Sequence, residues 1–137
     1  MSYLVEAKRL LQAEKFRTAD YGRGATEVEI LAAEAELGVA FSASYRAFLR
    51  EFGWMISAYL SIDGLGPDVD SAADLRRSCH SWREEVDAEI RLPRHLAPIA
   101  GDGAGNAYCL DVSRMQHQEC PVVFWDHESF EGVDQIP

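Results

Sequence analysis

Two helix boundaries, close together in the first half of the chain, most strongly constrain its fold. Thr26 and Glu29 have the spacing of a capping box, in which each side chain satisfies a free backbone amide of the first helical turn. Gly38 suits the left-handed residue that ends a helix. Ser42 and Gly53 bracket the next segment in the same way. The sequence therefore predicts two consecutive, well-delimited helices.

The apolar residues of these helices indicate which faces are packed. The first helix, from Glu27 to Leu37, has two apolar faces, which predicts burial on both sides. One face contains Ile30, Ala33, Glu34 and Leu37, and the other contains Val28, Leu31 and Ala35. In the second helix an aromatic stripe at i, i+3, i+4 and i+7 predicts a core face, with Arg46 and Arg50 outside. The stripe consists of Tyr45, Phe48, Leu49 and Phe52.

The rest of the chain alternates between helical and strand patterns. Residues 2–16 have helical spacing, and residues 54–62 alternate like a half-buried strand. A longer helix after Asp70 has an inward stripe at Leu75, Cys79, Trp82, Val86 and Ile90, and outward residues at Arg76, Arg83, Glu84 and Asp87. Apolar runs at 96–100, 108–112 and 122–125 predict consecutive strands, with the last in the middle of the sheet.

This order of elements predicts the α+β class, with helices packed on a mixed, mainly antiparallel sheet. The length of 137 residues corresponds to one domain, spanning 1–137, with enough apolar residues for a continuous core. We expect five core side chains to be buried: Tyr45, Phe48, Leu49, Trp82 and Trp125.

The net charge, the apolar runs and the cysteines argue against a nucleic-acid-binding protein, a membrane protein and a cysteine-based site. The net charge of −10 disfavours nucleic acid as a partner, because phosphates would be repelled. No apolar run is long enough to span a membrane and the N-terminus lacks a signal peptide pattern, so we expect a cytoplasmic protein without a membrane partner. The three cysteines, Cys79, Cys109 and Cys120, have no CxxC spacing and are interpreted as small buried hydrophobic residues.

Two motifs invite a chemical interpretation. Asp126-His127-Glu128, with His117, contains residue types of metal and acid–base sites, but adjacent strand residues point to opposite faces, which favours a structural strand-end cluster. Residues 101–106 are rich in glycine, but no helix or Lys-Ser follows, which favours a turn between two strands over a phosphate cradle. We therefore assign no catalytic residue, no metal and no cofactor.

Three segments carry a resemblance to a known family. The first, residues 25–53, contains Leu37-Gly38-Val39 followed by a helix with the pattern Tyr-x-x-Phe-Leu. The second, residues 99–113, contains a Gly-Asp-Gly turn before a strand that ends in Leu-Asp. The third, residues 121–129, has the sequence PVVFWDHES. Together, in this order, they resemble the SUKH superfamily, the Smi/Knr-like group of bacterial immunity proteins. Phe41-Ser42 replaces the Leu-Pro of many relatives, and Asn106 replaces a common aspartate. Relatives usually continue into a further helix, which this chain, ending at Pro137, would lack.

The resemblance implies a non-catalytic domain that binds and neutralises a cognate toxin in bacterial conflict systems. A regulatory scaffold is an alternative, as implied for eukaryotic relatives, and a small-ligand carrier or hydrolase using Asp102, Asp126 and His127 is a further one. The negative charge adds the expectation of a basic, nuclease-type toxin. The pattern leaves the oligomeric state open. Predicted partner-binding residues, placed at strand ends and loops, are Asp63, Asp68, Asp70, Asp102, Asp126 and Glu128.

Overall fold

The computed structural model of the chain describes residues 20–57, 61–84, 91–101, 106–126 and 131–133. The predicted helix over residues 2–16 and the predicted extension of the later helix over residues 85–90 lie outside this part. The elements follow one another as β1 (Asp20–Tyr21), α2 (Glu27–Leu37), α3 (Ala43–Glu51), β2 (Met55–Ile56), β3 (Ser61–Ile62), the 3-10 turn η1 (Ser71–Ala73), α4 (Leu75–Glu84), β4 (Leu96–Gly101), β5 (Ala107–Asp111), the 3-10 turn η3 (Val112–Arg114), β6 (Val122–Asp126) and β7 (Glu131–Val133).

Helix α2 begins and ends where the sequence predicts. The Thr26 hydroxyl accepts a hydrogen bond from the Glu29 amide at 3.2 Å, and the Glu29 carboxylate accepts one from the Thr26 amide at 3.0 Å. Gly38 follows in the left-handed conformation with φ 69°, and its amide donates to the Glu34 carbonyl. The prediction that α2 is buried on two sides is wrong, because Val28 and Leu31 are exposed. Only the face with Ile30 and Ala33 enters the core.

Helix α3 also begins at its predicted cap. The Ser42 hydroxyl accepts a hydrogen bond from the Tyr45 amide at 3.3 Å. Tyr45 and Leu49 are buried, whereas Phe48 is only partly buried against the same core. Arg46, predicted to lie outside, is also half-buried, because its guanidinium reaches back to Glu34 on α2 at 2.6 Å.

The α+β class is confirmed, but the strands form two antiparallel sheets instead of one mixed sheet. The orders are β1-β2-β3 and β4-β5-β6-β7. The single strand predicted over residues 54–62 is replaced by β2 and β3, which pair with each other through Met55 and Ile62. Strand β6 lies between β5 and β7, as predicted for the most apolar run. The Asp63 amide donates to the Ile99 carbonyl at 2.7 Å and thereby links the end of β3 to β4.

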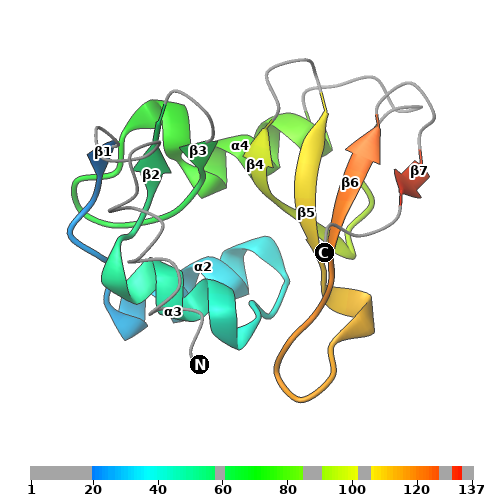
Figure 1. Cartoon of the computed structure of the whole chain (residues 1–137), viewed down its shortest axis with the longest axis horizontal. Coiled ribbons are helices and arrows are strands. Elements are labelled where there is room, and N and C mark those ends of the chain that lie inside the picture. Colours follow the sequence, from blue (N-terminus) through cyan, green and yellow to red (C-terminus); the bar gives the residue numbers. More distant parts are fainter. Residues whose placement is uncertain (1–19, 58–60, 85–90, 102–105, 127–130, 134–137) are drawn as a thin grey trace.

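Two clusters of buried side chains hold these layers together. Figure 1 shows the first sheet above α2 and α3, with the second sheet beside them and α4 between the two. The larger cluster joins α2, α3 and α4 to one face of the second sheet, through Ile30, Leu49, Leu75, Ala97 and Leu110. The smaller cluster lies on the opposite face around Cys109, Val123 and Trp125, with Trp82 of α4 partly buried against it.

Arg83 of α4 contradicts its predicted outward position. Its side chain is buried, with 5% exposure. The guanidinium donates to three backbone carbonyls, those of Leu37 at 2.8 Å, Arg94 at 3.2 Å and Leu96 at 3.2 Å. Arg83 therefore connects the end of α2 to the segment that leads into β4.

Candidate partner-binding surface

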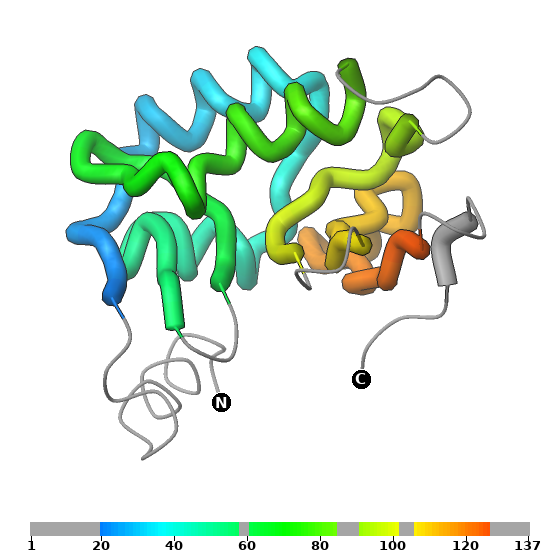
Figure 2. Tube along the Cα trace, turned by 90° about the horizontal axis from the view of Figure 1, so that it is seen from above, coloured from blue at the N-terminus to red at the C-terminus, as the bar shows by residue number. Residues whose placement is uncertain are grey.

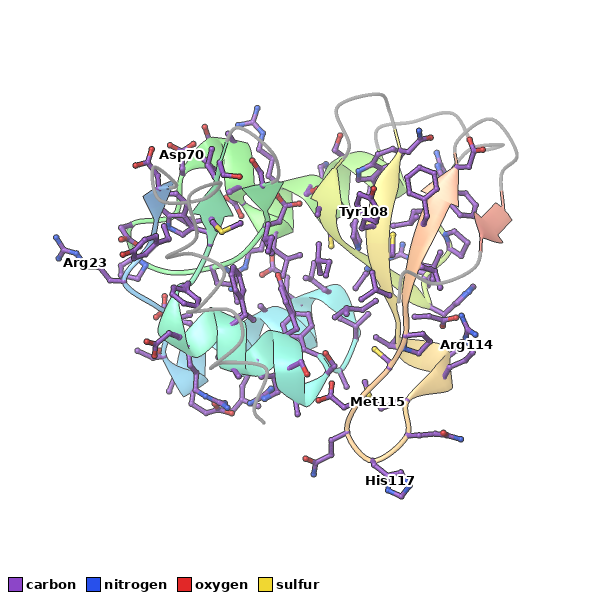
Figure 3. All side chains as sticks on the ribbon, viewed as in Figure 1. Arg23, Asp70, Tyr108, Arg114, Met115 and His117 are labelled. Carbon is purple, nitrogen blue, oxygen red and sulfur yellow. The ribbon has the colours of Figure 1, made fainter. Side chains whose placement is uncertain are left out.

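The loop between β3 and α4 presents two of the predicted carboxylates at the surface. Asp68 accepts hydrogen bonds from the Arg23 backbone amide at 3.2 Å and from the Trp54 indole at 3.4 Å. Asp70 accepts one from the Ala72 amide at 2.8 Å and so caps η1. Both residues are exposed, and Figure 3 shows Asp70 at the outer margin of the first sheet. These donors are neutral N–H groups, so the contacts hold both carboxylates in position without pairing them with a basic side chain.

The sequence of this loop explains why it is held so closely to α3. Gly64 packs directly on the Gly53 backbone: a Cβ atom at position 64 would lie 1.5 Å from the Gly53 carbonyl oxygen. The Leu65 amide donates to that same oxygen at 2.9 Å, and the Leu75 amide donates to the Gly64 carbonyl at 3.0 Å. The loop that carries Asp68 and Asp70 is therefore anchored at both ends by backbone hydrogen bonds.

Asp63 does not belong to this surface. It was predicted as a partner-binding loop residue, but it is buried, with 8% exposure, at the link between β3 and β4. Burial raises the pKa of its carboxyl from 3.8 to about 7; a hydrogen bond from Ser78 lowers this pKa, and the nearby Asp74 carboxylate raises it further. We therefore exclude Asp63 from the candidate surface.

Asp126 lies at the end of β6, on the second sheet. Its neighbour Trp125 is buried, whereas Asp126 is partly exposed and pairs in register with Glu131 of β7. Two residues before Asp126 on β6, Phe124 stands opposite Tyr108 of β5, with ring centroids 5.2 Å apart. The structure thus places Asp126 on the second sheet, whereas Asp68 and Asp70 lie on the loop that follows the first sheet. Asp102 and Glu128 lie outside the described residues.

The histidine cluster considered from the sequence is separated in space. His117 is exposed at the tip of the turn that precedes β6, whereas Asp126 lies at the far end of that strand (Figure 3). His127 falls outside the described residues. Within the described ranges, no three His, Cys, Asp or Glu side chains are grouped so that they could hold a metal ion.

The cysteines have the properties of packing residues. Cys79 and Cys109 are buried and Cys120 is partly buried. Burial raises the pKa of Cys79 and of Cys120 to about 11, and the pKa of Cys109 to about 12. All three therefore remain neutral thiols at pH 7, which is not the state of a nucleophile or a metal ligand.

Two hollows open at the other end of the molecule, around the turn at residues 115–120. One, of about 700 Å³, is lined by residues between Ser113 and Pro121. The other, of about 390 Å³, lies between this turn and the helices, with Phe41, Arg46 and Met115 in its wall. Neither is lined by Asp126, so neither supports a ligand site in the region considered from the sequence.

Most of the basic side chains in the described residues form ion pairs with carboxylates of the same chain. Arg50 pairs with Glu27 at 3.1 Å, and Arg114 pairs with Asp111 at 2.8 Å. Further pairs are Arg46 with Glu27 and Glu34, Arg76 with Glu36, and Arg94 with Glu84. Because these pairs are nearly neutral, the net charge of −10 resides mainly on carboxylates outside them, such as Asp68 and Asp70.

The comparison with known families agrees with this fold. None of the helices in the described ranges is long and apolar enough to cross a membrane. A family model, SUKH_5, described as SMI1-KNR4 cell-wall, matches residues 7–136, which is nearly the whole chain. The helix pair and strands that suggested the resemblance fall within that match, and the chain therefore belongs to the SUKH superfamily, in its SMI1-KNR4 family.

Proposed function

We propose that this chain is an immunity protein that binds and neutralises a cognate bacterial toxin, and that the toxin is a basic protein of the nuclease type. The observation that carries the proposal is the family match over residues 7–136, because SUKH membership is consistent with an immunity-type protein-binding domain. The activity requires no chemistry from this chain. To neutralise the toxin, the chain needs only to cover the surface with which the toxin contacts its substrate.

The charge distribution supports a basic partner. Asp68 and Asp70 are exposed on one anchored loop, and their hydrogen bonds come from neutral amides and an indole. A toxin that acts on nucleic acid needs a positive surface to hold phosphates, and an inhibitor that covers this surface is favoured when it is negative. Asp126, on the second sheet, supplies a further carboxylate for a partner wide enough to span both sheets.

The first test is protection of cells. A toxin domain from a gene that neighbours the gene of this chain is expressed with and without the chain, and growth is measured. We expect growth only when the chain is present. Growth arrest despite co-expression, together with no complex between the two purified proteins, contradicts the immunity function.

A second experiment tests the role of charge separately. The association rate with the same toxin domain is measured at about 50 and 500 mM salt, and we expect it to fall by roughly tenfold or more while dissociation changes less. The variant Asp68→Asn/Asp70→Asn keeps hydrogen-bond acceptors at both positions but removes two charges, and should also slow association. The matched control, Gln116→Lys/His117→Lys, changes the net charge equally at the opposite end. An association rate that is insensitive to salt, or equal effects of both variants, contradicts binding through the Asp68 loop.

A further inference from the structure

The outward face of α2 is apolar and uncovered. Val28 is 77% exposed and Leu31 is 53% exposed, and Ala32 and Ala35 on the same side are also exposed. These four residues, here called the outer strip, follow the i, i+3, i+4, i+7 spacing of one helix face. Figure 2 shows α2 along the margin of the described structure, with α3 and α4 on its inner side. Large exposed apolar side chains grouped on one helix face are a common mark of a protein interface.

Three of the four carboxylates of α2 pair with arginines of the same chain, whereas the fourth, Glu29, accepts hydrogen bonds from Thr26. Near the start of α2, Glu27 pairs with Arg46 and Arg50, and near its end Glu36 pairs with Arg76. The strip therefore lies between two ion-paired groups in a chain whose net charge is −10. Two copies of so acidic a chain repel each other over most of their surface, and an apolar face whose neighbouring carboxylates are mostly ion-paired is where they can approach most closely.

The shape of the outer strip fits a second copy of itself. Its two large residues, Val28 and Leu31, lie in the first half of α2, and the two small ones, Ala32 and Ala35, lie in the second half. In an antiparallel pair with a two-fold axis between positions 31 and 32, each large side chain faces a small one of the other copy. The antiparallel arrangement also places the N-terminus of each α2 beside the C-terminus of the other, where their opposite partial charges attract each other.

From this we infer that α2 is a self-association surface, through which two copies of the chain pack their outer strips antiparallel about a two-fold axis. The inference is independent of the proposed toxin binding, since it involves other residues. Three helical turns bury less area than a standard stable interface of about 1,600 Å². The dimer is therefore weak and forms at high protein concentration.

Sedimentation velocity of the full chain, from about 10 μM to about 1 mM, tests the association. We expect the average mass to rise from the monomer value of 15.3 kDa towards twice that value. Leu31→Glu should keep the chain monomeric throughout, while Ser81→Glu, which adds the same charge at an exposed position of α4, should not. A monomer at 1 mM, or a dimer that tolerates Leu31→Glu, overturns the inference.

Disulfide trapping tests the antiparallel geometry. Ala32→Cys lies beside the axis and should form a covalent dimer with itself on oxidation, at a rate well above that of the parent chain. Ala35→Cys should not, because two copies of position 35 are seven residues apart along the pair, about 10 Å. Mixing Ala35→Cys with Val28→Cys should restore trapping. Efficient self-trapping of Ala35→Cys would show a parallel pair and overturn the proposed symmetry.

Salt distinguishes this contact from toxin binding. Screening of the −10 charge should leave the dimer unchanged or strengthen it, whereas association with a basic toxin should slow. A dimer that dissociates as salt rises would be held by charges, and would contradict packing through the outer strip.

Discussion

The Arg83 guanidinium donates a hydrogen bond to the Leu37 carbonyl at 2.8 Å, across 46 positions of sequence. Leu37 is the last residue of α2, where carbonyls lack helical partners, so a positive donor there is favourable. The same guanidinium also binds the carbonyls of Arg94 and Leu96. One buried side chain thus satisfies acceptors from two distant segments.

We expect Arg83→Met to lower the free energy of unfolding by roughly 2–4 kcal/mol, because it keeps the aliphatic volume but leaves buried carbonyls without donors. Urea denaturation measures the change. Arg77→Met, at an exposed position of the same helix, is the control and should change stability little. Equal stability of the two variants would show that the carbonyl contacts contribute nothing.

The buried Asp63 carboxyl predicts a loss of stability as pH rises. Its folded pKa of about 7 lies above its ordinary value of 3.8, so the folded state holds a proton that the unfolded state releases. The contribution of this bound proton to the free energy of unfolding is complete below about pH 4 and disappears as pH rises through 7. Asp63→Asn should therefore raise the free energy of unfolding at pH 8 by roughly 2–4 kcal/mol relative to the parent, with little difference at pH 4.

Denaturation of parent and variant at several pH values checks this behaviour. Asp70→Asn, on the exposed loop, is the matched control and should follow the parent at all pH values. If Asp63→Asn is less stable than the parent at pH 8, the carboxylate is stabilised by its surroundings and the assigned direction is wrong.

The turn before β6 contains two residues in a backbone conformation that favours glycine and asparagine. His117 has φ 51° and Gln118 has φ 67°, and Gln116 and Glu119 exchange backbone hydrogen bonds of 2.7 and 2.9 Å across them. This is the geometry of a two-residue hairpin turn in which Asn-Gly is preferred. We expect His117→Asn/Gln118→Gly to raise the free energy of unfolding by about 1 kcal/mol.

The measurement is again urea denaturation, with Ser81→Asn on an exposed position of α4 as the control. The Gln118 carbonyl that accepts from the Ala43 amide, and the Glu119 carboxylate that binds Ser44, remain in the variant. A loss of stability would show that the parent side chains at the tip make contacts worth more than the backbone strain.

The two capped helices could be predicted accurately because their signals are local. Thr26, Glu29 and Gly38 act within one helix, and each residue meets its partner a few positions away. The two sheets could not be separated from sequence, because β1, β2 and β3 have two residues each and so show no periodicity.

The sequence also predicted the wrong environment for residues whose surroundings depend on distant segments, because those segments come together only in the folded chain. Arg83 has the charge of a surface residue, and only the folded chain brings Leu37 and Leu96 to it. Val28 and Leu31 have the helical spacing of an apolar face, but spacing cannot tell a face that is buried in the core from one that stays exposed. Asp68 and Asp70 were placed correctly on an exposed loop, while Asp63, five residues earlier, enters the interior.

The contact between Gly64 and Gly53 also limits how this fold can vary. A Cβ atom at position 64 would lie 1.5 Å from the Gly53 oxygen, so every other amino acid would push apart the strand end and the helix end that meet there. A library with all twenty amino acids at position 64, selected for folded protein, should return glycine alone. In relatives that keep the contact between these two backbone segments, a glycine at the position of Gly64 would mark the start of the loop that carries Asp68 and Asp70 here. This would hold even where the loop differs in length and charge and binds another partner.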